Sequence, residues 1–141
     1  MASASHVEEA LRAGLNTFWI GARTTTSPFA VAELAEALSG EDVTVLVKNP
    51  LNPDIELWEG ALLRLKSAGV DRIAAIHRGF STYGKGFYRN APLWQIPIEL
   101  RRRHPALTIL VDPSHISGRR DLVPLVSRIG LEMNFSGLMV E

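Results

Sequence analysis

Residues 43–50 read Val-Thr-Val-Leu-Val-Lys-Asn-Pro, a nearly continuous apolar run that ends in a charged residue and a turn. Such a run is typical of a strand that is covered on both faces, as in a parallel sheet. Residues 54–68 follow with a helical apolar stripe, and residues 73–76 are the next apolar run. Parallel strands joined through a helix form a right-handed βαβ unit. This segment therefore predicts the repeating unit of the fold.

The same unit recurs along the whole chain. The expected strands lie at residues 18–20, 43–47, 73–76, 107–111 and 138–140. The expected helices lie at residues 7–13, 29–38, 54–68, 96–103 and 121–131. Ser27 is a suitable N-cap, and Pro28 fits the first turn of the helix that follows. No linker interrupts the pattern, so we expect one α/β domain over residues 1–141.

The composition excludes several classes of protein. The 141 residues include no Cys, which excludes a disulfide framework and thiolate metal sites within this chain. The net charge is zero and no basic stripe is present, so nucleic-acid binding is not expected. No run approaches the roughly 18 apolar residues of a membrane span, and the N-terminus lacks a signal-peptide pattern. We expect a cytoplasmic protein without a membrane partner.

The charges are unevenly distributed along the chain. Residues 71–141 carry ten basic and six acidic groups, and nine of the ten basic residues are Arg. Guanidinium groups match the geometry of carboxylates and phosphates, so this half favours a small-anion site. Residues 101–103 and 119–120 are interpreted as Arg on solvated helix faces and are left outside that site.

Ionisable residues follow the expected strands at one topological position. They are Arg23, Lys48, Arg78, Asp112, His115 and Glu141. The carboxyl ends of parallel strands converge on the face where ligands bind in α/β folds. We therefore expect these strand ends to form one shared site.

The residue types indicate the chemistry of this site. Arg23, Lys48 and Arg78 form a positive cluster suited to an anion with two acidic groups, such as a phosphorylated carboxylate. His115 and Glu141 are donors suited to a divalent metal, with Asp112 as a candidate second-shell contact. Two ligands do not complete a metal site, so further ligands are expected from outside this sequence.

Residues 79–94 break the regular pattern. They hold half of the ten aromatic residues of the chain, namely Phe80, Tyr83, Phe87, Tyr88 and Trp94. Long loops in compact α/β domains are usually functional, and the aromatic content argues against disorder. This loop is expected to form either a wall of the site or a contact with another subunit.

Four motifs resemble those of the 3-deoxy-7-phosphoheptulonate (DAHP) synthases. They are residues 19–25 (Trp-Ile-Gly-Ala-Arg-Thr-Thr), 45–50 (Val-Leu-Val-Lys-Asn-Pro), 75–80 (Ala-Ile-His-Arg-Gly-Phe) and 111–115 (Val-Asp-Pro-Ser-His). Residues 88–103 are similar to the bacterial branch whose barrel is often fused to chorismate mutase. The motifs occur in family order and span essentially the whole chain after Ser5.

The resemblance implies a (β/α)8 TIM barrel, of which this chain would supply about five βα units. These correspond to strands four to eight, the C-terminal part of an incomplete barrel. The implied activity condenses phosphoenolpyruvate with erythrose 4-phosphate and releases phosphate, as the first step of the shikimate pathway towards chorismate and the aromatic amino acids. It also implies a homo-oligomeric parent protein, with a fused chorismate mutase domain as a further candidate partner.

The resemblance also assigns roles to residues. Arg23, Lys48 and Arg78 would bind phosphoenolpyruvate, and Lys48 and His115 would be catalytic. His115 and Glu141 would ligate a divalent metal such as Mn²⁺, which polarises the sugar aldehyde in the family.

Parts of the family pattern are missing from this sequence. The metal-binding Gly-Pro-Cys-Ser segment and the Lys-Pro-Arg-Thr segment that contacts both substrates are absent, and a further aspartate ligand would follow Glu141. We therefore expect the isolated chain to be inactive or nearly so. Unpaired edges at residues 18–20 and 138–140 are expected to cause self-association.

Other interpretations fit the same pattern. One is a flavodoxin-like open five-stranded module that acts in binding or signalling, and another is an assembly piece that uses residues 79–94 as a partner surface. A third is an enzyme similar to 3-deoxy-octulosonate 8-phosphate synthase, although the strand ends of that family look different. A fourth is another barrel enzyme that uses pyruvate or phosphoenolpyruvate.

Overall fold

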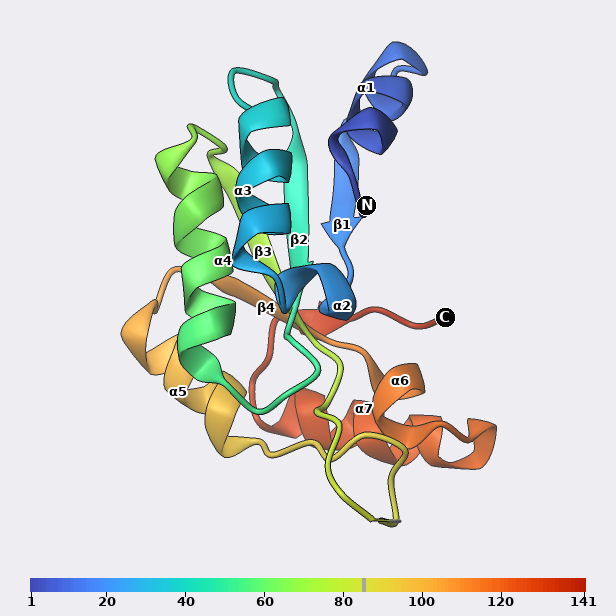
Figure 1. The fold of residues 1–141 in the computed structure, drawn as a ribbon. Coiled ribbons are helices and arrows are strands. Elements are labelled where there is room, and N and C mark those ends of the chain that lie inside the picture. The colour runs from blue at the N-terminus through green and yellow to red at the C-terminus, as the bar shows by residue number, and fades with distance from the viewer. Residues whose placement is uncertain (85) are drawn as a thin grey trace.

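The computed structural model describes residues 1–84 and 86–141 as five parallel strands and their connecting helices (Figure 1). The strands are β1 (Thr17–Ile20), β2 (Thr44–Lys48), β3 (Arg72–His77), β4 (Thr108–Val111) and β5 (Gly137–Leu138). Their order across the sheet is β1-β2-β3-β4-β5, the same as their order in the sequence. The predicted α/β fold with five parallel strands is therefore confirmed.

The sequential strand order decides between the expected architectures. A flavodoxin-like sheet has the order 2-1-3-4-5, in which the chain reverses direction across the sheet. Here every crossover adds the next strand to the same edge, as in a TIM barrel. The flavodoxin-like alternative is therefore wrong.

The helices follow the expected alternation with a few differences in extent. They are α1 (Ala4–Arg12), α2 (Ala22–Thr25), α3 (Pro28–Ala37), α4 (Ile55–Ser67), α5 (Gln95–Arg103), α6 (Pro113–Ser117) and α7 (Val123–Glu132), with a 3₁₀ turn, η1 (Arg120–Leu122). The helix expected at residues 121–131 is thus divided between η1 and α7, since Pro124 lies in the first turn of α7. The short helices α2 and α6 were not predicted.

The last strand is shorter and earlier than expected. It pairs Gly137 with Leu110 and Leu138 with Val111, the last residue of β4. Residues 139–140 were predicted to be part of this strand. They run past the end of β4 as irregular chain, although the Met139 amide still donates to the Val111 backbone oxygen at 2.9 Å.

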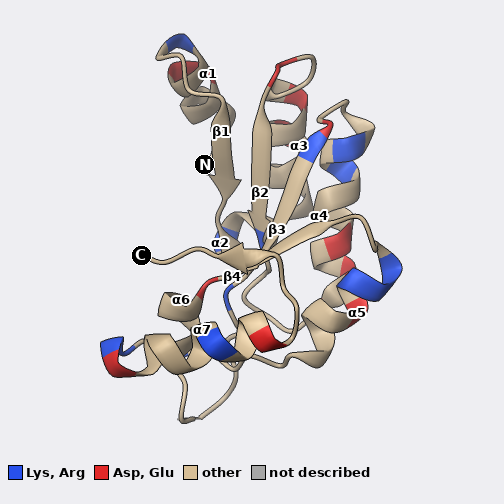
Figure 2. Ribbon diagram, turned by 180° about the vertical axis from the view of Figure 1, so that it is seen from behind, with Lys and Arg blue, Asp and Glu red and all other residues tan. Residues whose placement is uncertain are grey.

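Side chains alternate between two faces of the sheet. The outer face, defined by Phe18, Val45, Ala75 and Ile109, is buried and belongs to the hydrophobic core. The inner face, defined by Trp19, Leu46, Ala74 and Leu110, is less well covered, and Trp19 is 49% exposed. Seen from behind, β2 and β3 lie in front of α3 and α4, which cover the outer face (Figure 2).

Local capping explains where the two central helices begin. The Ser27 side chain accepts a hydrogen bond from the Ala30 amide, and Pro28 occupies the first turn of α3 as predicted. The Asp54 side chain accepts a hydrogen bond from the Leu57 amide and caps α4 in the same way.

Among the described residues, no helix has the length and apolar character that a membrane span requires.

Candidate active site

Strand alternation brings three predicted site residues to the inner face at the carboxyl end of the sheet. Lys48 lies two residues after Leu46, and Asp112 lies two residues after Leu110. Glu141 follows β5 and reaches the same place, where its backbone amide donates a hydrogen bond to Ser114 Oγ. Because residues i and i+2 share a face in extended chain, these side chains converge without any long loop.

Lys48 connects the two carboxylates of this group. Its Nζ donates to Asp112 Oδ2 at 3.1 Å and to Glu141 Oε1 at 2.7 Å. The Lys48 and Asp112 side chains are buried, with 7% and 0% of their surface exposed. The hydrogen bond from Lys48 lowers the pKa of Glu141, and partial burial opposes that shift. One ammonium group thus lies between a buried carboxylate and a partly exposed one.

Asp112 also fixes the position of His115. As the N-cap of α6, its Oδ1 accepts a hydrogen bond from the His115 backbone amide at 3.0 Å. Its Oδ2 lies 2.8 Å from His115 Nδ1. One buried carboxylate therefore orients both Lys48 and His115.

The donor atoms of Asp112, His115 and Glu141 suit a divalent metal ion. One atom from each residue lies within 4.8 Å of the others. An imidazole and two carboxylates are the ligand types that cations such as Mn²⁺ accept. The two predicted ligands, His115 and Glu141, are thus brought together, and Asp112, predicted as a second-shell contact, lies near enough to be a ligand itself.

Arg78 lies at the end of β3 and is held by asparagine side chains. Its backbone amide donates to Asn49 Oδ1 at 2.7 Å, and its Nη1 donates to Asn90 Oδ1 at 3.2 Å. Burial lowers the pKa of the Arg78 guanidinium, Asp112 opposes the shift, and the charges of Arg89 and Arg23 add to it. Arg78 is therefore a fixed cation within electrostatic range of other charged groups.

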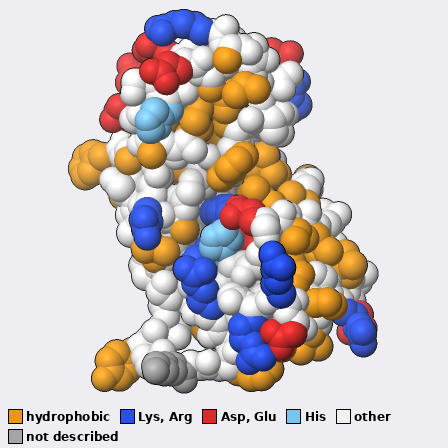
Figure 3. All heavy atoms as spheres, turned by 90° about the vertical axis from the view of Figure 1, so that its right-hand side faces the viewer, with side chains coloured by type: hydrophobic (Ala, Val, Ile, Leu, Met, Phe, Trp, Pro, Cys, Tyr) orange, Lys and Arg blue, Asp and Glu red, His pale blue; other side chains and the backbone are white. Residues whose placement is uncertain are grey.

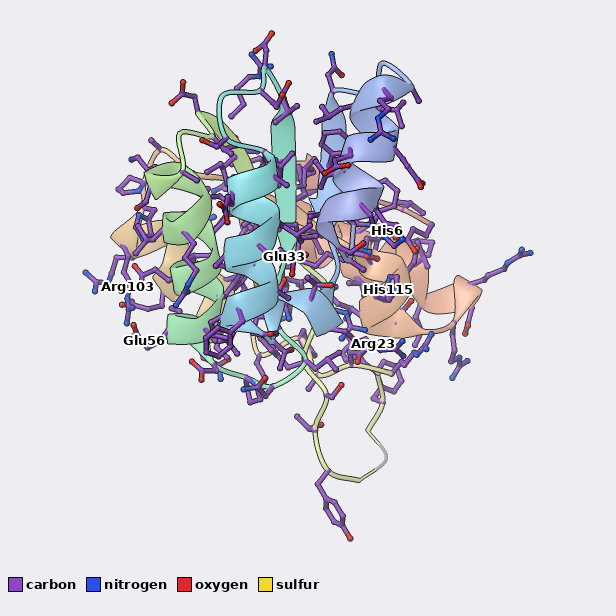
Figure 4. All side chains as sticks on the ribbon, turned by 45° about the horizontal axis from the view of Figure 1, so that its top comes forward. His6, Arg23, Glu33, Glu56, Arg103 and His115 are labelled. Carbon is purple, nitrogen blue, oxygen red and sulfur yellow. The ribbon has the colours of Figure 1, made fainter. Side chains whose placement is uncertain are left out.

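Arg23 is the third member of the predicted cationic cluster, with Lys48 and Arg78. It lies on α2, directly after β1, and its side chain is exposed. Within the described part of the chain it makes no side-chain hydrogen bond or ion pair. Figure 4 shows Arg23 and His115 at the same end of the sheet. On the molecular surface, a histidine and an acidic side chain lie among several basic side chains on this face (Figure 3).

His77, the last residue of β3, lies next to Arg78 in the sequence but away from these site residues. It points to the outer face, where its ring centroid lies 6.4 Å from that of Trp58, 5.8 Å from Phe80 and 5.0 Å from Trp94. Complete burial lowers the pKa of His77 to about 3, so the ring is neutral at physiological pH. His77 does not belong to the shared site.

The sequence analysis missed the residue that connects Arg78 to His115. Asn90 is buried, and its Nδ2 donates to the His115 backbone oxygen at 2.6 Å while its Oδ1 accepts from Arg78. Gly79 permits this contact, since a Cβ on Gly79 would lie 2.8 Å from Asn90 Cβ. Asn90 lies within residues 88–103, the segment that is similar to one branch of the family. An asparagine alone, however, does not indicate a role.

In the arginine-rich segments, Arg102, Arg103, Arg119 and Arg120 are exposed as expected, and Arg101 is half-buried. Arg101 donates to the Met133 backbone oxygen at 2.7 Å, and its guanidinium carbon lies 4.7 Å from the centroid of the Phe135 ring. Arg103 pairs with Glu56 and Glu59 of α4. Arg101 thus links α5 to the segment that follows α7, and Arg103 links α5 to α4.

Arg119 and Arg120 are exposed as expected, and both line a pocket of about 320 Å³ beside His115 and Glu141. Arg119 is paired with Asp121, with 2.6 Å between Nη2 and Oδ2. Their position next to the predicted metal ligands follows from α6, the short helix that the sequence pattern did not reveal.

Sequential parallel strands with charged groups at their carboxyl ends define a segment of a TIM-barrel enzyme. The model of the DAHP synthetase I family matches residues 4–141. The chain belongs to this family.

Known relatives agree with this assignment. The chain is 34% identical over 97 residues to phospho-2-dehydro-3-deoxyheptonate aldolase of Thermotoga maritima, an alignment that covers 69% of this chain and 28% of that protein. It resembles a truncated 3-deoxy-D-arabino-heptulosonate 7-phosphate synthase structure from T. maritima with a TM-score of 0.82 and 27% identity, covering 99% of this chain and 50% of that one.

A second solved structure, the phospho-2-dehydro-3-deoxyheptonate aldolase of T. maritima, gives a TM-score of 0.84 at 26% identity. That match covers 100% of this chain and 40% of the other. The chain thus spans half or less of the length of these relatives. The expectation of a partial DAHP synthase barrel is confirmed.

Proposed function

We propose that this chain carries the phosphoenolpyruvate-binding and metal-binding part of a DAHP synthase. The reaction would condense phosphoenolpyruvate with erythrose 4-phosphate and release phosphate. The observation that supports this most strongly is the position of Lys48, whose Nζ contacts both Asp112 and Glu141. It joins the cationic cluster to the metal-type donors, so that one site can hold an anion beside a metal.

The anion would be held by Arg23, Lys48 and Arg78. Planar guanidinium groups bind phosphate and carboxylate through paired hydrogen bonds, and a lysine adds a compact charge. Arg78 and Lys48 are buried, and charge interactions are stronger where water is excluded. Arg23 is exposed, so it can close on the ligand from the solvent side.

The metal would be held by His115 and Glu141, with Asp112 as a third contact. When bound, it would polarise the aldehyde of the sugar phosphate. Asp112 keeps His115 in place through the α6 cap, and Asn90 holds the His115 backbone oxygen. Both contacts limit movement of the imidazole before any ligand arrives.

Lys48 would serve catalysis as well as binding. Its ammonium group can keep a proton close to the point where negative charge develops during the condensation. Asp112 accepts a hydrogen bond from this group and holds it in position.

The isolated chain is expected to show no DAHP synthase turnover, or nearly none. The family segments Gly-Pro-Cys-Ser and Lys-Pro-Arg-Thr would supply a metal ligand and substrate contacts that this chain lacks. A steady-state assay of the 141-residue chain with Mn²⁺ and both substrates measures this. Robust turnover would show that the missing contacts are not required.

Binding of phosphoenolpyruvate tests the proposal without turnover. Isothermal titration should show binding to the wild-type chain and an affinity at least about ten-fold weaker for Arg23→Ala, because one charge-assisted contact is lost. Arg128→Ala, which removes an exposed arginine on α7, should bind as the wild type does. No binding to the wild type, or equal losses in the two variants, would contradict the proposal.

A further inference from the structure

We propose that Asn90 is a positioning residue that couples anion binding at Arg78 to metal binding at His115. The inference rests on the proposed function, in which these two residues hold the anion and the metal. Asn90 contacts neither ligand and acts only through the two residues that do.

The Asn90 side chain joins the two residues directly. Its Oδ1 accepts a hydrogen bond from Arg78 Nη1 at 3.2 Å, and its Nδ2 donates to the His115 backbone oxygen at 2.6 Å. Asn90 is only 5% exposed, so breaking either bond leaves a buried polar atom without a partner. A single buried amide therefore connects the anion-binding residue to the metal-binding residue.

The chemistry of the two partners allows only one orientation of this amide. A guanidinium group offers only donors, and a backbone carbonyl oxygen only accepts. Rotation of the Asn90 amide by 180° would therefore break both bonds at once. Because an amide group is planar and rigid, its two ends move as one unit. A shift of Arg78 is thus transmitted to His115, and the reverse.

The segment that carries Asn90 is fastened to the helix that carries His115. The Asn90 backbone amide donates to the Ile116 oxygen of α6 at 3.1 Å. Gly118 leaves room for this close approach, since a Cβ at residue 118 would lie 2.5 Å from Arg89 Cβ. Asn90 therefore follows the position of α6 through both its backbone and its side chain.

Asn49 offers a comparison, because it also holds Arg78. It is fully buried, and its Oδ1 accepts from the Arg78 backbone amide at 2.7 Å. Its Nδ2 donates to the Pro50 and Gly79 oxygens, both at 2.8 Å. Within the described part of the chain, its side chain makes no hydrogen bond to α6. Loss of Asn49 should therefore disturb the anion site without affecting its connection to His115.

The connection through Asn90 predicts that the two ligands favour each other. His115 moves less when it holds a metal, and the Asn90 amide then keeps Arg78 in one orientation. The anion consequently finds a more ordered site and loses less conformational entropy on binding. By reciprocity, the anion raises the metal affinity by the same factor. Lys48 also joins the cationic residues to the metal-type donors, so loss of Asn90 should reduce this coupling rather than abolish it.

The test is isothermal titration of phosphoenolpyruvate into the chain, once in EDTA and once with saturating Mn²⁺. The ratio of the two dissociation constants is the coupling factor. We expect this factor to be at least about three-fold smaller in Asn90→Ala than in the wild type. Asn49→Ala should bind phosphoenolpyruvate more weakly in both conditions but keep the wild-type factor. Asn16→Ala removes an exposed asparagine directly before β1 and should change neither quantity.

A second variant, Asn90→Asp, keeps the shape of the side chain in case Asn90→Ala does not fold, as judged by thermal unfolding. The carboxylate can still accept from Arg78, but it has no donor for the His115 oxygen. Its added charge should weaken phosphoenolpyruvate binding in both conditions. The coupling factor should fall as in Asn90→Ala, because the contact with α6 is lost.

The outcomes separate this inference from the proposed function. A wild-type coupling factor in both Asn90 variants overturns the inference. Equal reductions in Asn49→Ala and Asn90→Ala also overturn it, because they would reflect a general loosening of Arg78. A wild type whose phosphoenolpyruvate affinity does not depend on Mn²⁺ overturns the inference and leaves the proposed function standing. A wild type that binds no phosphoenolpyruvate contradicts the proposed function, and the inference then fails with it.

Discussion

His77 and Arg78 are neighbours at the end of β3, yet they lie in opposite environments. His77 faces the outer layer, among Trp58, Phe80 and Trp94, and its two ring nitrogens are buried without a hydrogen-bond partner. Arg78 faces the ligand end, where Asn49 and Asn90 hold it. The alternation of side chains along one strand thus separates a dry, neutral layer from a charged site.

The comparison sets a buried ionisable group with aromatic neighbours against buried groups that form an ion pair. In the outer layer, desolvation keeps His77 uncharged. At the inner face, the buried Lys48 and Asp112 side chains lie 3.1 Å apart as an ion pair. The following changes to single residues test this contrast.

Asp112→Ala should have the largest effect on stability. It removes the buried partner of Lys48 and the cap of α6, and breaking a buried ion pair typically costs about 3–5 kcal/mol. The free energy of unfolding in denaturant measures this loss. Asp42→Ala removes an exposed partner of Arg72 and should change stability little. Similar losses in the two variants would contradict the contrast.

His77→Phe should flatten the dependence of stability on pH. The pKa of His77 is about 3 in the folded chain and about 6.5 when unfolded, so acid protonates the unfolded state first. The wild type should therefore lose about 2 kcal/mol between pH 7.5 and pH 5 through this residue. Unfolding curves at several pH values compare the two proteins, and identical pH profiles would refute a neutral buried histidine.

Gly79→Ala should destabilise the chain by about 1–2 kcal/mol or more. Gly79 has a φ of +77°, and the new Cβ would collide with Asn90, which holds Arg78. Gly40→Ala is a matched control, because Gly40 has a φ of +78° but nothing within 4 Å of its Cβ position. The difference between the two losses isolates the Asn90 contact. Equal losses of stability in the two variants would mean that the collision with Asn90 does not add to the cost of the substitution.

Trp19→Thr should affect stability least, within about 0.5 kcal/mol, but should reduce self-association. Trp19 lies on the edge strand β1 and is half-exposed on the inner face. Light scattering of the wild type should show oligomers. Phe29→Thr, which removes an apolar side chain exposed on α3, should leave them unchanged. A monomeric wild-type chain would exclude the expected association.

Much of the fold could be predicted because its signals are local. Apolar runs define all five strands, and the caps at Ser27 and Asp54 mark α3 and α4. The short helices α2 and α6 were missed because four or five residues are too few to show a helical period.

Part of the candidate site could also be predicted from a local signal, namely the alternation of side chains along each strand. Charged residues two positions beyond a strand remain on its face, so Lys48 and Asp112 could be inferred to converge. Which of two adjacent strand-end residues faces the ligand, as with His77 and Arg78, depends on register against neighbouring strands. The roles of Asn90 and Gly118 depend on contacts between distant segments, and no local pattern reports those.

The most direct test of whether these strand ends form one site is the ³¹P resonance of phosphoenolpyruvate bound to the chain, recorded with and without Mn²⁺. A metal at His115 and Glu141 beside the cationic cluster should broaden the phosphorus signal strongly in the wild type. It should do so far less in His115→Ala at equal occupancy by phosphoenolpyruvate. Equal broadening in both proteins, or none in the wild type, would show that the anion and the metal do not share this end of the sheet.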